Sequence, residues 1–445
     1  MFAVVLNGPG RCTMVPFSRS KRKFVLRSIC SRAAVGFVAG GLVLLPAAVT
    51  SAQTFQVLHN FTAGADGNTP NGLAIDRAGN LYGTTGGPGN CVNGGVCGGV
   101  FKFAREQSGW ILTSLYHFRG GSDGSWPNAT VTIAPDGTLY GTTTSGGGGR
   151  CSYGGIPGCG TVYHLQPPSH ICSSVSCPWN DTILYAFQAS PDVQNPYAEV
   201  TLDAAGNVFG TGTFGGGLDL YGGGVFELTR SQGNWRYDLL HSFNGPDGER
   251  VYNPVLLDRA GNILGTTDLG GEHLNGVVFE LSLSGSGWIE DILHTFGPAP
   301  DGAGPEGLIS DSAGNLYGAA AAGGAHGSGA VFELSPSGSG YTYSVLYDGF
   351  FSPVGGGGPR GPLVMDSAGN LYGTTSGTGR YSFGMLFELS PNGTGWTFTD
   401  LHDFTGTDDG ESPQGRLVVD SSGNVYGVTA GGGAYTFGVI WELTP

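Results

Sequence analysis

Hydrophobic and polar positions along this chain form a repeated pattern of short alternating runs. In a typical unit one apolar run ends at an Asp, as in residues 72–76, and a second, such as 80–85, follows a Gly. A third run, such as 224–228, and a fourth, such as 235–243, complete the unit. Each run is short, rich in β-branched and aromatic residues and bounded by Gly or Pro, which predicts a strand. No helical period follows residue 52.

The pattern recurs with the signature Asp-x-x-Gly-Asn-(Leu/Val/Ile)-(Tyr/Phe/Leu)-Gly. Its aromatic position falls at Tyr82, Tyr140, Phe209, Leu264, Tyr317, Tyr372 and Tyr426. The steps are 58, 69, 55, 53, 55 and 54 residues, which fit a four-stranded propeller blade and exceed the period of a β-helix or leucine-rich repeat. We therefore predict an all-β fold, a seven-bladed β-propeller of four-stranded antiparallel blades.

The Asp and Gly of the signature are typical of a tight turn between the first two strands. Asp76 can accept hydrogen bonds from the turn backbone, and Gly79 can adopt a left-handed conformation. Calcium is a weaker explanation, because a calcium loop gathers several oxygen ligands and each turn here offers one.

The two ends of the chain complement each other. The last unit stops after its third strand, residues 438–443, whereas an additional strand, residues 55–61, precedes the first full unit. We predict that residues 54–61 form the outermost strand of the last blade. This pairing closes the ring and removes an unpaired sheet edge.

The first 52 residues differ in composition from the rest. They contain seven Lys or Arg, no Asp or Glu, and an apolar run over residues 33–48 that leads to Thr50-Ser51-Ala52. We interpret residues 1–52 as a secretory signal peptide and residues 53–445 as one propeller domain. The alternative is a retained membrane anchor, although the run is short and interrupted by Gly and Pro. The expected location is secreted, either extracellular or periplasmic.

Charge narrows the range of partners. Without the seven basic residues of the leader, the net charge changes from −15 to −22. Such a surface repels phosphate backbones and anionic lipid, so we expect no nucleic-acid partner and no membrane insertion after signal cleavage. An extracellular glycan or protein is the expected ligand of a monomer.

Six cysteines follow the leader and fall as near neighbours. An even number in an exported chain predicts local disulfides that fix long loops. The expected pairs are Cys91 with Cys97, Cys151 with Cys159, and Cys172 with Cys177. Zinc binding by these cysteines is the alternative, but no His stands at ligand spacing beside a CxxC pair. We expect no metal and no cofactor.

Units such as residues 293–296, followed by Asp301-Gly302 and residues 311–318, resemble the GloVer tandem repeat of "choice-of-anchor" bacterial surface proteins. The resemblance covers residues 54–445. It implies an extracellular location, often with a C-terminal sorting or anchoring segment, and no established activity. The sequence departs from that pattern by ending at Pro445 without such a segment, so anchoring, release and periplasmic retention stay open as alternatives.

Candidate binding residues lie in the loops around the expected axial channel, because loops on a rigid scaffold are where binding usually occurs. The loops that lead into the first strands share an Asp, with a Pro four residues later except after Asp247. The binding candidates are Asp66, Asp123, Asp192, Asp247, Asp301, Asp409 and Trp126. The carboxylates would attract a cation or sugar hydroxyls, and the indole would stack on a sugar. The alternative is a structural Asp-Gly turn followed by a Pro at the strand start.

Catalytic candidates are few. One recurring histidine position, Leu-His-x-Phe, is occupied by Tyr in other units and indicates packing. His273 and His326 lie in second-to-third-strand loops of neighbouring units, and with Glu272 they are the general acid/base candidates. The alternative is that both histidines are solvated loop residues.

Two functions follow from these residues. The first is a secreted or cell-surface binding module for a glycan, protein or surface ligand. The alternative is an extracellular propeller enzyme, a polysaccharide lyase, a glycosidase or a small-molecule lyase, with its site at the channel mouth.

Overall fold

The computed structural model describes the backbone of residues 2–6 and 12–16, and residues 53–87, 97–153, 155–168, 178–217, 221–285, 287–338, 340–352 and 357–445. The chain divides into two compact parts, Met1–Thr50 and Ser51–Pro445. The first contains an antiparallel pair, β1 (Phe2–Leu6) and β2 (Cys12–Pro16). The apolar run expected to act as a signal lies outside the described residues. Among those residues, no helix is long and apolar enough to span a membrane.

The part Ser51–Pro445 is built from four-stranded antiparallel sheets, as the sequence pattern predicts. The first sheet contains β4 (Asn68–Ile75), β5 (Leu81–Gly87), β6 (Gly99–Glu106) and β7 (Gly109–His117). The second contains β8 (Thr132–Ile133), β9 (Leu139–Thr143), β12 (Thr161–Gln166) and β13 (Asn180–Ala186). The third contains β15 (Thr201–Leu202), β16 (Val208–Gly212), β18 (Gly224–Ser231) and β19 (Asn234–Ser242).

Three more sheets follow the same order. The fourth sheet contains β20 (Leu256–Leu257), β21 (Ile263–Thr267), β22 (Val277–Ser284) and β23 (Gly287–Thr295). The fifth contains β24 (Gly302–Ser310), β25 (Leu316–Gly323), β26 (Ala330–Ser337) and β27 (Gly340–Tyr347). The sixth contains β28 (Val364–Met365), β29 (Leu371–Thr375), β30 (Met385–Pro391) and β31 (Trp396–Asp403). Two short loop ladders pair β10 (Ser152–Tyr153) with β11 (Ile156–Pro157), and β14 (Val193–Gln194) with β17 (Phe214–Gly215).

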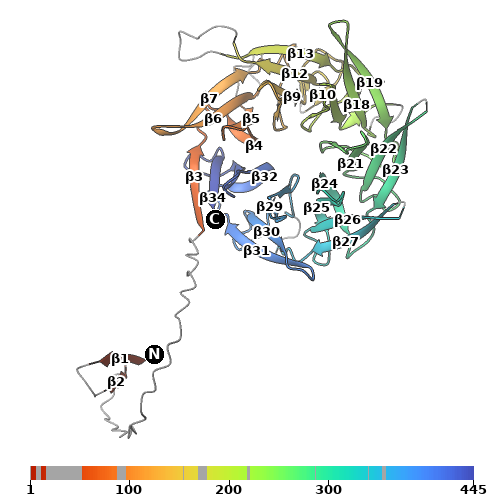
Figure 1. Ribbon diagram of the computed structural model, residues 1–445. Helices are drawn as coiled ribbons and strands as arrows, with labels where there is room; N and C mark the ends of the chain where they lie inside the picture. The colour runs from red at the N-terminus through yellow and green to blue at the C-terminus, as the bar shows by residue number, and fades with distance from the viewer. Residues whose placement is uncertain are drawn as a thin grey trace, which may run out of the picture. The chain divides into compact units, whose positions relative to one another are not determined.

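The last sheet joins the two ends of the part Ser51–Pro445. It contains β32 (Glu411–Val419), β33 (Val425–Gly431), β34 (Val439–Thr444) and the N-terminal strand β3 (Thr54–Asn60). β3 pairs antiparallel with β34, and β32 touches β4 through one parallel bridge between Arg416 and Gly72. Figure 1 shows the orange β3 and the blue β34 side by side, with the sheets arranged around a common centre in a β-propeller-like fold.

The signature turn has the geometry expected from its sequence. One carboxylate oxygen of Asp76 accepts hydrogen bonds from the backbone N–H groups of Ala78 at 2.8 Å and Asn80 at 2.9 Å. Gly79 has a φ of 81°, which glycine adopts without strain. The most regular element of the sequence is therefore a hairpin turn.

The core lies between neighbouring sheets. A Phe that follows the fourth strand of each unit is almost completely buried: Phe61, Phe118, Phe187, Phe243, Phe296, Phe350 and Phe404. Each packs against an aromatic residue of the third strand in the next unit. For example, the ring centroids of Phe243 and Phe279 lie 5.0 Å apart. The aromatic repeat thus holds adjacent sheets together.

Threonines of the second strands add hydrogen bonds near the centre. Thr142 Oγ1 donates to the backbone oxygen of Ala198 in the next sheet at 2.8 Å, and Thr211 Oγ1 donates to that of Asn253 at 3.1 Å. Thr84 and Thr266 make the same contact. In these four repeats the threonine of the second strand therefore fixes the inner segment against the next sheet.

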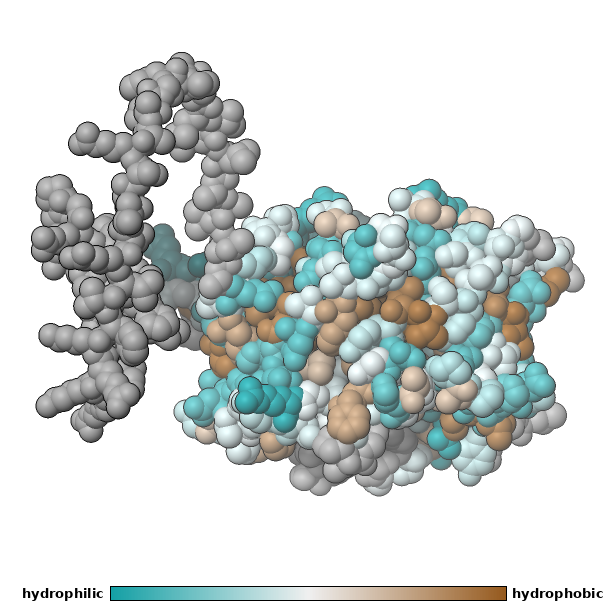
Figure 2. Space-filling view, turned by 90° about the horizontal axis from the view of Figure 1, so that it is seen from below, coloured by the Kyte–Doolittle hydropathy of each residue, from teal (hydrophilic) through white to brown (hydrophobic). Residues whose placement is uncertain are grey.

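The visible outer side of the part Ser51–Pro445 is mixed in polarity. Figure 2 shows hydrophobic residues mainly across its middle, with more hydrophilic residues above and below. The fourth strands alternate in exposure, and three of the exposed large hydrophobic residues, Ile111, Ile289 and Ile292, lie on them. This alternation is expected for a strand with one face toward the core and one toward solvent.

One of the expected disulfides lies within the described residues. Cys151 and Cys159 are bonded, with their Cα atoms 4.9 Å apart. Cys97 is buried, but its expected partner Cys91 lies outside the described residues. Cys172 and Cys177 also lie outside them.

Candidate binding site

A cavity of about 500 Å³ lies where the first strands of all the sheets converge. Because every sheet contributes to its lining, it occupies their common centre. Its polar lining consists of Asn71, Asn128, Thr130, Tyr197, Glu199, Tyr252, Asn253, Asp268, Glu306, Arg360, Gln414 and Arg416. Its size falls in the range of small-molecule and cofactor sites, roughly 300–1,000 Å³.

The same step of each repeat supplies the lining. A Pro, or Val251 in the fourth unit, leads into the first strand, and the residue after it reaches the cavity wall. That residue is Asn71, Asn128, Tyr197, Tyr252, Glu306, Arg360 or Gln414 in successive units. The Pro packs against a left-handed Gly of the preceding unit: a Cβ on Gly384 would lie 2.5 Å from Pro413 Cδ. A fixed step therefore presents a variable side chain.

Two ion pairs organise the charged part of the wall. Arg416 Nη1 lies 2.7 Å from Glu199 Oε1, and Arg360 Nη1 lies 3.8 Å from Glu306 Oε1. Both carboxylates are largely buried, with 11% and 15% of their side chains exposed, whereas both arginines are about half exposed. Each arginine therefore partly neutralises a carboxylate in the wall.

Burial affects the carboxyl groups on the side of the fourth and fifth units. Burial raises the pKa of Glu306 to about 7, although Arg360 and the backbone N–H of Gly361 lower it. Burial also raises the pKa of Asp268, against the opposing effect of Arg250 and Arg360. Near neutral pH the Glu306 carboxyl can therefore both donate and accept a proton.

Three amide side chains of the lining are held in place by hydrogen bonds to the backbone of another unit. Asn71 donates to Pro127 O at 3.0 Å, and Asn253 donates to Pro305 O at 3.1 Å. Gln414 of the last unit donates to Pro70 O of the first at 3.1 Å. These bonds orient the amides before any ligand arrives, which is the basis of a pre-organised site.

Two tyrosines form the aromatic part of the wall. The rings of Tyr197 and Tyr252, from neighbouring units, lie 5.6 Å apart and perpendicular to each other. Both are partly exposed. Such rings bury large areas and can pack against the apolar face of a sugar.

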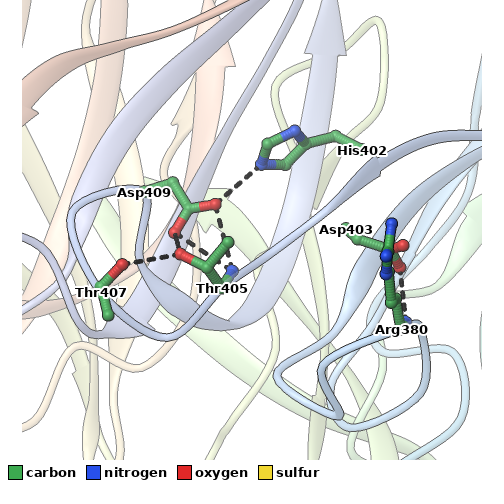
Figure 3. A network of polar contacts seen from close by, with 6 residues as sticks. All are labelled: Arg380, His402, Asp403, Thr405, Thr407 and Asp409. Carbon is green, nitrogen blue, oxygen red and sulfur yellow. Dashed lines mark hydrogen bonds and ion pairs between the residues drawn. The ribbon is translucent and has the colours of Figure 1, made fainter. Parts of the chain in front are cut away.

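The recurring aspartates predicted as binding residues lie elsewhere, and none lines the cavity. Each faces the His or Tyr of the fourth-strand position: His59–Asp66 at 3.2 Å, Tyr116–Asp123 at 3.1 Å, Tyr185–Asp192 at 2.8 Å, His241–Asp247 at 3.1 Å, His294–Asp301 at 3.2 Å and His402–Asp409 at 3.0 Å. In Figure 3, Asp409 also accepts a hydrogen bond from the backbone N–H of Thr405.

These contacts stabilise the charged form of one carboxylate in particular. Burial alone would raise the pKa of Asp301, but hydrogen bonds from His294 and the backbone N–H of Gly297 help to lower it to about 2. The aspartates are thus engaged in loop structure, which matches the turn interpretation of their sequence pattern.

The other candidates are dispersed. Trp126 is half-buried with a left-handed φ of 58° and lies outside the cavity lining. Glu272 and His273 are exposed in the loop between β21 and β22, and His326 is exposed between β25 and β26. Among the described residues no hydrogen bond or ion pair joins these histidines, so the structure does not assemble them into one site.

Sequence comparison identifies the repeat. The model of the "Gloeobacter/Verrucomicrobia repeat" matches residues 148–351 and 342–445. The chain belongs to this repeat family. The resemblance inferred from the repeated units is thereby confirmed over residues 148–445. No curated protein matches this chain by sequence.

Several solved structures resemble this protein in fold. An ulvan lyase, described as a new family of polysaccharide lyase, shares 11% identity, covers 84% of this chain and 91% of its own, and has a TM-score of 0.51. A fungal alcohol oxidase of the AA5 family in complex with copper shares 14% identity, covers 85% and 74%, and has a TM-score of 0.50. At such identities the likeness supports the β-propeller fold alone.

The repeat pattern does not single out the residues that line the cavity, because these residues do not recur. The residue after the strand-leading Pro differs between units, and Gln414 and Glu306 have no distinctive motif around them. The available signal was variability at one fixed step of a regular repeat. In a repeat protein, a position that packing does not constrain is free to serve a ligand.

Proposed function

We propose that residues 53–445 form a closed seven-bladed propeller, exported from the cell, that binds a neutral oligosaccharide in its central cavity. One observation carries the proposal: the residues that vary within the repeat converge on that cavity, while the recurring residues are used in turns, inter-sheet packing and hydrogen bonds between sheets.

The chemistry of the wall favours sugar hydroxyls. Asn71, Asn253 and Gln414 supply oriented amides, and Tyr197 with Tyr252 supplies aromatic surface. A site built to hydrogen-bond hydroxyl groups needs such fixed polar groups beside an apolar wall.

The charge balance favours a neutral ligand. Both arginines of the lining already pair with carboxylates, so no unpaired cation cluster awaits an anionic group. The acidic character of the chain as a whole also opposes the approach of an anionic polysaccharide.

The closed ring would keep this wall rigid. β3 completes the last sheet, and Gln414 links that sheet to Pro70 of the first. Closing the ring restricts relative motion of the sheets, so the ligand would meet a pre-formed site at low entropic cost.

Catalysis is the second candidate, because one group in the wall favours it. Glu306, with its pKa raised to about 7 by burial, would serve as a general acid or base if a scissile bond lay within hydrogen-bond reach. Among structures of similar fold, the ulvan lyase acts on a polysaccharide, as its description states. Turnover of the bound sugar separates this candidate from a binding module.

The test combines a glycan array with calorimetry and product analysis on chain 53–445. Tyr197→Ala and Tyr252→Ala should each weaken binding of the selected sugar about tenfold or more, since a packed aromatic contributes about 1–3 kcal/mol to a site. Tyr435→Ala, an exposed tyrosine outside the cavity lining, is the matched control and should bind as the parent chain does. Equal loss in all three variants, or no sugar bound, would overturn the proposal.

A further inference from the structure

One position on the fourth strand of every unit faces the preceding unit. Its equivalence follows from the strand register, since Tyr237 pairs with Leu228 and Glu290 pairs with Leu281 at the same step of their sheets. Around the ring the position is occupied by Leu112, Asp181, Tyr237, Glu290, Tyr343, Phe398 and Phe55. It is a junction position between units.

The usual occupant of the junction is an aromatic ring. Tyr343 stacks on His294 of the preceding unit at 3.8 Å between centroids, with an interplanar angle of 3°. Phe55 stacks on His402 in the same way at 3.6 Å. Tyr237 and Phe398 stack on tyrosines. An aromatic ring thus normally covers the His or Tyr near the end of the fourth strand of the preceding unit.

The junction between the third and fourth units departs from this arrangement. Glu290 replaces the ring and lies 3.5 Å from His241 Nε2, which is itself 3.1 Å from Asp247 Oδ2. Asp247 is also the recurring aspartate that lacks the usual Pro. Glu290 Oε1 is buried and has no hydrogen-bond partner among the described residues. Two departures from the repeat therefore meet beside an unsatisfied carboxylate oxygen.

We propose that His241, Asp247 and Glu290 form a zinc-type transition-metal site between the third and fourth units. One ligand atom from each residue lies within 4.8 Å of the others. The two contacts of His241 Nε2, 3.1 and 3.5 Å, bracket the separation of about 3.3 Å between ligands in a tetrahedral zinc site.

The donor set selects the class of cation. An imidazole with two carboxylates suits zinc and related first-row ions, whereas calcium and magnesium prefer oxygen ligands alone. Asn244 orients Asp247 by donating its backbone N–H to Oδ1 at 2.8 Å and its amide to Oδ2 at 3.2 Å. Such outer contacts support a metal ligand. Water would complete the coordination, because all three side chains keep some exposure.

The junction of the first and second units shows why histidine matters. There a carboxylate, Asp181, also replaces the ring, but the facing residue is Tyr116, whose hydroxyl lies 3.4 Å from Asp181 and 3.1 Å from Asp123. The tyrosine hydroxyl has a single hydrogen, which lies between the two carboxylates. It does not offer the neutral nitrogen that zinc prefers.

At the proposed site the cation would act as a clamp. It would join β19 of the third sheet and the loop after it to β23 of the fourth, in addition to the threonine contacts between second strands and the next sheet. A ligand that binds only the folded chain raises its stability, so zinc should raise the melting temperature in a concentration-dependent way.

The test uses chain 53–445 freed of metal with a chelator. Calorimetry with zinc chloride should show one equivalent bound, and cobalt chloride should give the visible absorption of a tetrahedral site. Glu290→Gln and Glu290→Tyr should each weaken zinc binding at least about 100-fold, because each removes a direct ligand. Glu290→Tyr recreates the junction seen at Tyr343, so it should fold normally. His402→Ala, at a junction with an aromatic ring, should bind zinc as the parent chain does.

Two outcomes would overturn the site. One is the absence of heat and of any melting shift with zinc in the parent chain. The other is zinc binding in Glu290→Tyr as tight as in the parent, which would place the ion elsewhere. Neither result depends on sugar binding, so the outcome for the central cavity stays separate.

Discussion

Arg416 Nη1 lies 2.7 Å from Glu199 Oε1, although the two residues are 217 positions apart in the chain. Glu199 precedes β15 of the third sheet and Arg416 belongs to β32 of the last, with the first and second sheets between them. Both line the central cavity. The pair therefore lies in the wall of the cavity between the sheets, and it joins sheets that share no strand pairing.

This bridge should contribute modestly to stability. Arg416→Ala leaves the largely buried Glu199 without its cation, so the free energy of unfolding should fall by about 1 kcal/mol, given that the arginine is half exposed. Glu199→Gln combined with Arg416→Ala should recover part of that loss. A double-mutant cycle by urea unfolding measures the coupling, and a coupling energy of zero would contradict the bridge.

Loss of β3 should affect stability far more. A chain that begins at residue 62 leaves β34 as an unpaired edge and removes the stack of Phe55 on His402 and the buried Phe61. We expect its melting temperature to fall by roughly 10 °C or more relative to chain 53–445. Calorimetry measures the difference, and adding a peptide of residues 53–61 should restore part of it. An unchanged melt would show that the ring does not depend on this strand.

The fold could be predicted from the sequence because the residues that define it recur. The Asp76 turn and the Phe after each fourth strand are repeated local devices, and their spacing gives the number and order of strands. The pairing of β3 with β34 could be predicted because an additional strand at one end matched a missing strand at the other.

The candidate site could not be predicted in the same way. Glu199 and Arg416 meet only through the folding of the whole chain, and nothing near either residue indicates the other. The raised pKa of Glu306 depends on burial, which a sequence does not show. The recurring aspartates were prominent in sequence for the opposite reason: they are loop contacts, needed in nearly every unit.

Stability should depend on pH through Glu306. Its folded pKa, raised to about 7 by burial, exceeds the ordinary value of 4.5, so the folded chain holds this proton more tightly than the unfolded chain does. The stabilisation is therefore complete below pH 4.5 and is lost as pH rises toward 7. Glu306→Gln removes this dependence and should make the protein more stable than the parent at pH 8, by about 1–3 kcal/mol.

Comparing variants isolates this group from other titrations. The difference in unfolding free energy between Glu306→Gln and the parent should grow between pH 5 and pH 8. A difference for Glu306→Gln that does not change with pH would contradict the raised pKa.

The inter-sheet threonines offer a matched pair of substitutions. Thr142 and Thr374 are both buried on second strands, but Thr142 Oγ1 donates to Ala198 O at 2.8 Å, whereas Thr374 Oγ1 has no partner among the described residues. Replacing Thr by Val keeps the shape and removes the hydroxyl. Thr142→Val should cost about 1 kcal/mol or more, because it leaves a buried carbonyl without its donor. Thr374→Val should be neutral or stabilising, because it removes an unsatisfied polar group. Chemical denaturation of both variants measures the contrast, and equal destabilisation would mean that the hydrogen bond between sheets adds nothing beyond packing.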